Sequence, residues 1–208
     1  ELIDLPGLYS LYTPAPEQGE VAQYLAARRP DVLINVVDST NLERNLYLTT
    51  QLLETGLPLV VALNMEDELR EKGASLNSRM LSTILGVPCV KISAANGSGI
   101  ERLLKTVQDV AAHPYLGRSE QVAQLYAPEL RQGMAQTLAA LDRAQFSGQL
   151  QQRAVALQAL ATPAPGTEAS GNNWEQRLSA ERYRVIAAIL PQVLKTARMP
   201  ASRRLTKR

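Results

Sequence analysis

Three apolar runs alternate with helical patterns in the first half of the chain. Each run is apolar along almost its whole length, which is typical of a strand covered on both faces. The runs are residues 31–40 (DVLINVVDST), 57–65 (LPLVVALNM) and 87–93 (VPCVKIS). Amphipathic helices are predicted at residues 41–56, 75–86 (with Ser75 as its cap) and 99–112. Because strand, helix and parallel strand in succession form a right-handed crossover, the pattern predicts an α/β fold with a mostly parallel sheet.

The pattern changes near residue 113, beyond which no β-rich run is evident. Helices are predicted at residues 119–145, 148–162 and 174–198. A Pro-, Gly- and Ser-rich stretch at residues 162–173 is typical of a mobile loop. We therefore predict an α/β domain over residues 1–112 and an α-helical domain over residues 113–208.

Charge and cysteine content exclude several classes of protein. The net charge is +2 with acids and bases interspersed, so no nucleic-acid partner is expected. Cys89 is the only cysteine, which excludes an intrachain disulfide and fits a reducing compartment. No apolar run approaches the ~20 residues that span a bilayer. The basic end, residues 198–208, is most simply a solvated tail, but it would also suit an anionic membrane surface.

Polar loops follow the strands, at the sheet edge where open α/β folds bind ligands. The first loop follows the apolar Leu2 and Ile3, which are expected to end a strand. It comprises Asp4, Leu5, Pro6 and Gly7. A carboxylate at Asp4 can hold Mg²⁺ through water, and Gly7 lets its N–H approach a γ-phosphate. An ordinary turn is the commoner interpretation of such a motif on its own.

The second loop follows residues 57–65 and comprises Asn64, Met65, Glu66 and Asp67. The Asp67 carboxylate can accept hydrogen bonds from N1–H and the 2-amino group of guanine, a pairing that adenine cannot make. Asn64 is expected to brace neighbouring loops and to contact the purine. Asn and Asp are also common as turn and helix-cap residues, which is the simpler alternative.

The third loop follows residues 87–93 and comprises Ser93, Ala94 and Ala95. A small residue with a free backbone N–H at this point could contact the guanine O6. The three loops occur in the sequence order used by GTPases, each directly after its strand, so coincidence is a poor explanation.

Three stretches of the chain resemble the cytosolic GTP-binding domain of the FeoB family of bacterial ferrous-iron transporters. They are DLPGLYSL, the run from PDVLINVVDST to ALNMEDE, and SAANGSGIERL. The segment NLERNLYLT, with Met65 where most GTPases have Lys, is particularly specific. The resemblance is dense from Asp4 to Ala111, and beyond it ERYRVIAAIL resembles the linker that leads toward the membrane.

The resemblance implies a Ras-like P-loop GTPase sheet, followed by a helical regulatory domain, with GTP or GDP and Mg²⁺ as ligands. Asp4 and Gly7 would sense Mg²⁺ and the γ-phosphate, and residues 8–13 would form a switch. Asn64 and Asp67 would read guanine, and residues 93–95 would close over the base. Met65 in place of Lys predicts weak affinity and fast exchange. Leu8, where Ras-like proteins have a catalytic Gln, cannot orient water.

In this family the phosphate loop, the first helix and the first switch precede the position of Glu1. The chain contains no Gly-x-x-x-x-Gly-Lys-[Ser/Thr]. We therefore expect an N-terminally incomplete GTPase that binds GTP poorly and hydrolyses it negligibly by itself, and we assign no catalytic residue. In the parent protein, GTP hydrolysis would regulate Fe²⁺ passage through a membrane domain after Arg208, at the cytoplasmic face of the bacterial inner membrane. The fragment itself is expected to be soluble, and its oligomeric state stays open.

Two other interpretations remain. A non-enzymatic interaction module would keep the sheet and helices for docking after losing nucleotide chemistry. A GTPase of the translation-factor class would be expected to have Lys in place of Met65 and a basic or aromatic RNA-binding extension, and neither is evident.

Overall fold

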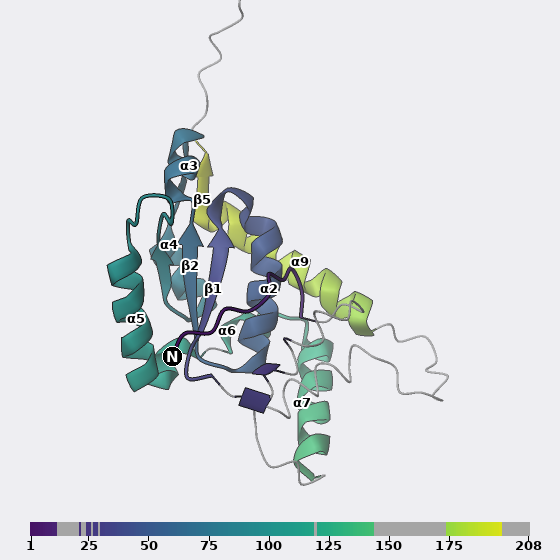
Figure 1. The fold of residues 1–208 in the computed structure, drawn as a ribbon. Coiled ribbons are helices and arrows are strands. Elements are labelled where there is room, and N and C mark those ends of the chain that lie inside the picture. Colours follow the sequence, from purple (N-terminus) through teal and green to yellow (C-terminus); the bar gives the residue numbers. More distant parts are fainter. Residues whose placement is uncertain are drawn as a thin grey trace, which may run out of the picture.

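The three apolar runs form a parallel sheet in the computed structural model, which describes residues 1–11, 21, 24, 25, 27, 28, 30–118, 120–143 and 174–196. The strands are β1 (Leu33–Asp38), β2 (Leu59–Asn64) and β4 (Cys89–Lys91). Their order is β1-β2-β4, with β2 in the centre (Figure 1). The predicted α/β class with a parallel sheet is confirmed.

Helices cover both faces of this sheet. They are α2 (Leu42–Thr55), α4 (Ser78–Leu85) and α5 (Ile100–Ala112). Alternate residues of β2 face opposite ways: Val60 packs in a cluster with Leu103 of α5, and Val61 packs in the larger core on the side of α2. As predicted, α2 and α4 end at Gly56 and Gly86, both in the left-handed conformation that favours glycine.

Short elements connect the main ones. They are η1 (Ser39–Asn41), α3 (Glu66–Glu71), β3 (Ala74–Leu76), η2 (Pro114–Gly117) and α6 (Gln121–Gln124).

The C-terminal part contributes α7 (Pro128–Arg143), α9 (Trp174–Val193) and the strand β5 (Leu194–Thr196). α9 packs against α2, and Ile186 and Ile189 belong to the same hydrophobic core as Leu46 of α2 (Figure 1). The single helix predicted at residues 119–145 is wrong, because α6 and α7 are separate. Pro128 disfavours helical geometry at Ala127 and is itself well suited to start a new helix.

β3 and β5 form a second, antiparallel pair, in which Ser75 lies opposite Lys195. No strand was expected after residue 113, and a helix was expected to extend to residue 198. Both predictions are wrong, because α9 ends at Val193 and β5 follows it. Ser75 is not a helix cap either, because it lies in β3; the cap of α4 is Asn77, whose side chain accepts a hydrogen bond from Met80 N at 3.0 Å. Strands of three residues carry almost no local pattern, so pairing between distant segments decides them.

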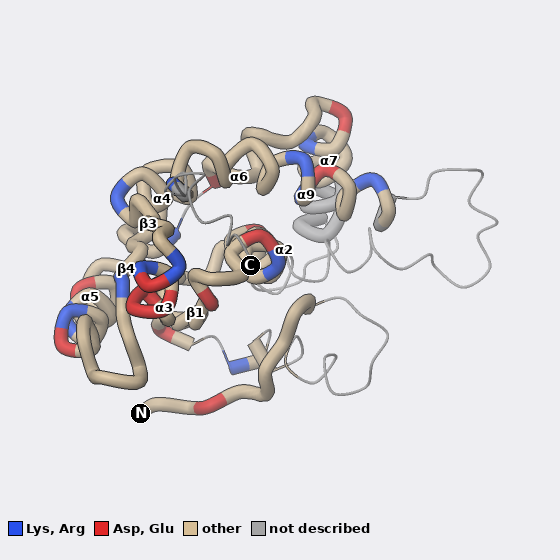
Figure 2. The backbone as a smooth tube through the Cα atoms, turned by 90° about the horizontal axis from the view of Figure 1, so that it is seen from above, with Lys and Arg blue, Asp and Glu red and all other residues tan. Residues whose placement is uncertain are grey.

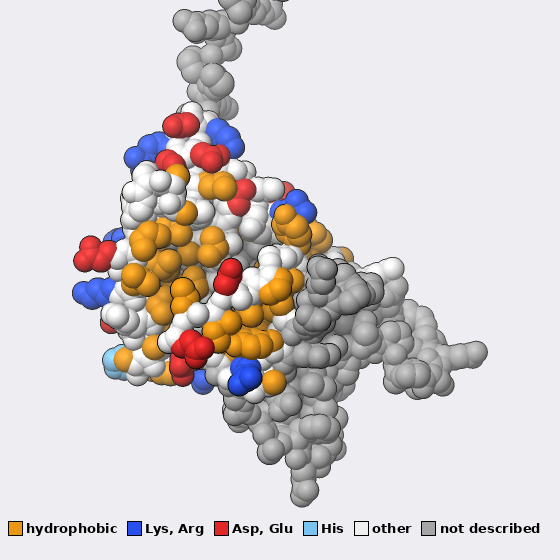
Figure 3. All heavy atoms as spheres, viewed as in Figure 1, with side chains coloured by type: hydrophobic (Ala, Val, Ile, Leu, Met, Phe, Trp, Pro, Cys, Tyr) orange, Lys and Arg blue, Asp and Glu red, His pale blue; other side chains and the backbone are white. Residues whose placement is uncertain are grey.

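The N-terminal segment forms no strand before Asp4, contrary to prediction. Leu2 and Ile3 are 85% and 50% exposed, and the segment runs to α2, where Leu11 is buried (Figure 1). A strand requires a hydrogen-bonded neighbour, and among the described residues no strand pairs with this segment. Val36 of β1 is 57% exposed on the side of the sheet covered elsewhere by α5, and apolar side chains gather on this face (Figure 3).

Several predicted segments lie outside the described residues. They are the end of the predicted switch at residues 12–13, the helix at 148–162, the loop at 162–173 and the basic end at 198–208.

Candidate functional site

The second and third polar loops meet at the carboxyl ends of β2 and β4. Asn64, the last residue of β2, accepts a hydrogen bond at Oδ1 from the backbone N–H of Ala94, at 2.9 Å. Next to it, the N–H of Ile92 donates to the carbonyl of Leu63 at 2.8 Å and continues the ladder between the two strands. The Asn64 side chain therefore joins the two loops, which is the bracing contact expected of it.

Met65 turns the chain sharply from β2 into α3. Its φ is +61°, in the left-handed region, and it is the one non-glycine residue of the described chain with a positive φ. For a residue with a side chain this conformation costs about 1–2 kcal/mol. The Met65 carbonyl accepts the Leu69 N–H at 3.0 Å, so the strained residue begins α3 directly after β2. This turn places half-buried Asp67 in the first turn of α3, at the same edge as the third loop.

The first turn of α3 is acidic. Seen from the carboxyl ends of the strands, α3 carries a group of acidic residues (Figure 2). Glu66 pairs with Lys91 of β4, with 2.6 Å between Oε1 and Nζ, and this ion pair ties α3 to the sheet. Negative charge is favourable at a helix N-terminus, so the acidic residues of this turn suit the start of α3.

The third loop is held by hydrogen bonds between its own backbone groups. Ser93 N donates to Ser98 O, and Gly97 N donates to Ser93 O, each at 2.9 Å. Gly99 then starts α5 with φ +79°, and a Cβ there would lie 2.2 Å from the Lys91 carbonyl oxygen. The loop is therefore held against β4 at a distance that only glycine allows.

These contacts leave few free donors in the third loop. The N–H of Ser93 and the N–H of Ala94 are already used, the first by Ser98 and the second by Asn64. Of the three residues, only Ala95 has an N–H without a partner in the described part of the chain, and it is exposed. A ligand that needs a backbone donor from this loop would therefore find it at Ala95.

Buried oxygen atoms without hydrogen-bond partners mark the same edge of the sheet. Within the described ranges they are Ser39 Oγ, Glu66 Oε2 and Ser93 Oγ. Each belongs to the segment that directly follows β1, β2 or β4. An unsatisfied buried polar group costs about 1–3 kcal/mol, so three of them at one edge suggest a place where water or a polar ligand completes the hydrogen bonding.

The first loop is arranged differently. Asp4, Pro6 and Gly7 are exposed, whereas Leu5 packs partly against the core. A Cβ on Gly7 would meet nothing within 4 Å, so its backbone is open to a ligand. The structure therefore joins the second and third loops and leaves the first open to solvent.

The donors for a metal are few. Among the described residues no three His, Cys, Asp or Glu side chains gather closely enough to hold an ion. The exposed carboxylate of Asp4 fits Mg²⁺ only as one ligand among waters and phosphate oxygens, which is the usual way that this ion is bound.

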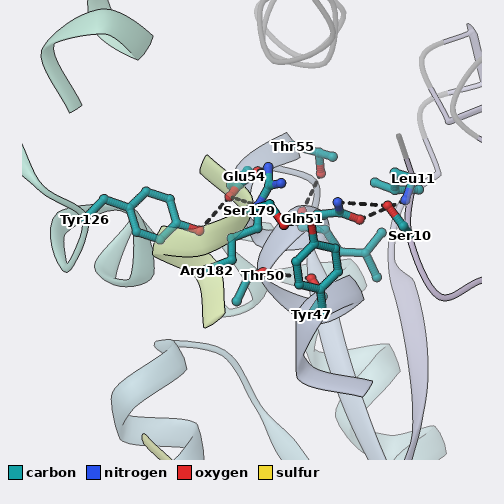
Figure 4. Close-up of polar contacts among 11 residues, drawn as sticks. Ser10, Leu11, Tyr47, Thr50, Gln51, Glu54, Thr55, Tyr126, Ser179 and Arg182 are labelled. Carbon is teal, nitrogen blue, oxygen red and sulfur yellow. Dashed lines mark hydrogen bonds and ion pairs between the residues drawn. The ribbon is translucent and has the colours of Figure 1, made fainter. Parts of the chain in front are cut away.

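Polar side chains of α2 make contacts that the sequence pattern did not predict. Gln51 contacts Ser10 and Leu11 of the N-terminal segment, and Glu54 contacts Arg182 of α9 (Figure 4). These contacts can be recognised only in the structure, where α2 is buried between the sheet and α9. No local pattern distinguishes a buried Gln or Glu from one on a solvated helix face.

Known proteins resemble this chain in sequence. Residues 1–107 match the sequence profile of the family described as Ferrous iron transport protein B. The Fe(2+) transport protein A/Fe(2+) transporter FeoB fusion protein of Porphyromonas gingivalis is 51% identical over 108 residues, which are 51% of this chain and 13% of that protein. Fe(2+) transporter FeoB of Salmonella typhimurium is 48% identical over 106 residues, which are 49% of this chain and 14% of that protein. The matched region is thus a small part of these relatives.

Solved structures share the fold. A GDP-bound mutant of the S. thermophilus FeoB G-domain is 32% identical, with a TM-score of 0.78, and the match covers 92% of this chain and 80% of that one. The cytosolic domain of the T. maritima FeoB iron transporter in its GDP form I has a TM-score of 0.79 at 21% identity, over 92% of this chain and 78% of that one. At that identity the second match shows the fold alone.

Proposed function

Because the chain belongs to the Ferrous iron transport protein B family, we propose that residues 1–112 form a guanine-nucleotide-binding domain and residues 113–208 a helical domain that regulates it. The observation that carries the proposal is the hydrogen bond from Ala94 N to Asn64 Oδ1, because it holds together the two loops that would enclose a base. The S. thermophilus relative, solved with GDP, supports the choice of ligand.

Base recognition is assigned to the edge formed by α3 and the third loop. The Asp67 carboxylate would accept hydrogen bonds from N1–H and the 2-amino group of guanine, and the backbone N–H of the exposed Ala95 would donate to O6. Adenine has no matching donors for Asp67 and an amino group where guanine has O6. The preference for guanine over adenine would arise because adenine leaves the Asp67 carboxylate without a hydrogen-bond partner.

Phosphate recognition is assigned to the first loop. Gly7 and Asp4 are both exposed, so the Gly7 N–H would donate to a phosphate oxygen and the Asp4 carboxylate would contact a hydrated cation. Bound with the nucleotide, Mg²⁺ would neutralise phosphate charge. The switch role of residues 8–13 and the exchange behaviour expected from Met65 belong to the same proposal.

The relatives are named as Fe(2+) transporters, and this chain spans about 13 to 14% of their length. We extend the proposal to the larger protein: GTP binding and hydrolysis would regulate Fe²⁺ passage through a membrane domain at the cytoplasmic face of the bacterial inner membrane. Within the ranges that the structure describes, no helix is long and apolar enough to cross a bilayer.

The test is binding of a fluorescent guanine nucleotide in the presence of Mg²⁺, with excess unlabelled GTP or ATP as competitor. It is made on this chain and on a version extended at its amino terminus. Competition by GTP and not by ATP, in either version, supports the proposal. If neither version binds, the interaction-module interpretation replaces it.

A further inference from the structure

α2 contacts the segment that follows the DLPG loop through two of its side chains. Gln51 uses both ends of its amide: Leu11 N–H donates to Oε1 at 2.8 Å, and Nε2 donates to Ser10 Oγ at 3.0 Å (Figure 4). The Arg44 guanidinium lies over the ring of Tyr9, 3.7 Å from its centre. Three consecutive residues of the segment are therefore bound to one helix.

The contacts of Gln51 are deeply buried, in contrast to the start of the segment. Gln51 and Leu11 are 1% and 4% exposed, whereas Leu2 is 85% exposed. Separating Gln51 from Leu11 without admitting water would leave two buried polar groups unpaired, which is unfavourable. The segment is thus fixed at Leu11 and becomes more exposed to solvent toward Glu1.

The helix that carries Gln51 is itself held in place. Glu54, one turn further along α2, accepts hydrogen bonds from Tyr126 Oη at 2.6 Å and from Arg182 Nε at 2.9 Å (Figure 4). Both partners lie outside the parallel sheet, in the loop after α6 and in α9. Gln51 therefore projects from a rigid support.

We propose that Gln51 is a positioning residue that fixes the point at which the segment carrying Asp4 and Gly7 leaves the core. The inference rests on the proposed function of that segment in sensing a γ-phosphate. Gly7 precedes Leu11 by four residues, so an anchor at Leu11 restricts Gly7 to a reach of about 14 Å. A restricted donor has a higher effective concentration at its target, so the anchor favours contact with a terminal phosphate.

The first experiment measures the anchor without any nucleotide. Amide hydrogen exchange of Leu11 is compared by NMR in the wild-type chain and in Gln51→Met, which keeps the length of the side chain and loses both hydrogen bonds. We expect exchange to be at least about tenfold faster in the variant, as for loss of one buried hydrogen bond. Gln51→Glu, which keeps an acceptor oxygen, should restore much of the protection.

Thr50→Val is the matched control. Thr50 is equally buried on α2, but its hydroxyl donates to the Tyr47 carbonyl of the same helix at 2.7 Å. Its removal should leave Leu11 exchange unchanged. Equal exchange of Leu11 in wild type and Gln51→Met overturns the proposal.

The second experiment compares affinities for GMPPNP and GDP in the presence of Mg²⁺. Gln51→Met should weaken GMPPNP about five- to tenfold relative to GDP, because only GMPPNP has a group at the γ position. Thr50→Val should not change the ratio. An unchanged ratio in Gln51→Met, in a chain that binds both nucleotides, overturns the functional role. The affinities are measured on this chain and on the version extended at its amino terminus. If neither version of the wild type binds a nucleotide, the proposed function fails, and the exchange measurement by itself decides whether Gln51 fixes the segment.

Discussion

The carboxylate of Glu54 and the guanidinium of Arg182 form a buried, two-pronged ion pair, although 128 residues separate them in the sequence. The hydroxyl of Tyr126 donates a third hydrogen bond to the same carboxylate. Burial, and then the nearby Glu54 charge, raise the pKa of Tyr126 above its ordinary value, so the phenol keeps its proton and remains a donor. This cluster connects α2 to the C-terminal part of the chain.

Glu54→Gln should therefore be strongly destabilising. It removes the negative charge that Arg182 pairs with while the guanidinium stays buried, and breaking a buried ion pair in this way typically costs about 3–5 kcal/mol. Urea unfolding followed by circular dichroism measures the loss. Arg184→Gln serves as the control. It breaks a pair with Glu181 in which the Arg184 side chain is 58% exposed, so it should cost less than Glu54→Gln.

Replacing both members of the buried pair tests the cause. A Glu54→Leu, Arg182→Met double variant removes both charges, so it should be more stable than Glu54→Gln. If it is less stable, the loss in Glu54→Gln does not come from an unpaired charge.

Gly99→Ala should distort the third loop. An added Cβ would lie 2.2 Å from the Lys91 carbonyl oxygen, in addition to the strain of a φ of +79°. Gly97→Ala provides a matched control, because Gly97 has φ +77° with nothing within 4 Å of an added Cβ. In the control, φ strain should lower the free energy of unfolding by about 1–2 kcal/mol. The decrease should be clearly larger in Gly99→Ala. Equal losses of unfolding free energy in the two variants would show that the loop accommodates the added Cβ of Gly99→Ala at no additional energetic cost.

Asp67→Asn should reduce affinity for guanine nucleotides, if the proposed function holds. The substitution removes a charged acceptor and presents an N–H toward a base that also presents N–H groups. The expected loss of about 1.5–3 kcal/mol corresponds to roughly 10- to 150-fold in Kd. Xanthine nucleotides, with a carbonyl at C2, should gain affinity in the same variant.

Glu68→Gln is the control for this prediction, since Glu68 is an exposed carboxylate of the same helical turn. Its affinity for fluorescent GDP should match the wild type. A similar loss in both variants would indicate a general effect of negative charge on α3, and not base recognition by Asp67.

Cys89 should be unreactive in the folded chain. Burial raises the pKa of its thiol from 9.0 to about 12, so the thiolate is scarce at pH 8. Alkylation by iodoacetamide at pH 8 should be at least about 100-fold slower than in urea, because reaction requires opening of the core. Comparable rates in the two conditions would contradict the buried placement.

The same thiol predicts a dependence of stability on pH. Its pKa is higher in the folded chain, so its contribution is complete below pH 9 and is lost as the pH rises from 9 toward 12. Cys89→Ala should therefore lose less stability than the wild type between pH 8.5 and about 10.5, the accessible part of that window. Parallel curves for the two proteins would rule out this contribution.

Much of the fold follows from local pattern. The three parallel strands were predicted by continuous apolar runs, because strands covered on both faces need apolar residues at nearly every position. Gly56 and Gly86 end their helices as predicted, because both adopt a positive φ that suits glycine. The loops after β2 and β4 could be chosen as candidate sites because the carboxyl ends of parallel strands share one edge.

Local pattern could not specify how the site is assembled. Asn64 was expected to brace a neighbouring loop, but only the structure shows that its partner is the N–H of Ala94, which leaves Ala95 as the open donor. Every residue except proline has the same backbone N–H group, so the sequence does not indicate which of these groups are hydrogen-bonded in the fold.

The sequence by itself determined the class of fold, the order of the three loops and the family. The tertiary structure decided the pairing of β3 with β5, the anchoring of Leu11 by Gln51 and the burial of Glu54 against Arg182. The physical reason is that hydrophobic periodicity is a property of neighbouring residues. Whether a short strand is paired, or a polar side chain buried and satisfied, depends on segments that meet only when the chain is folded.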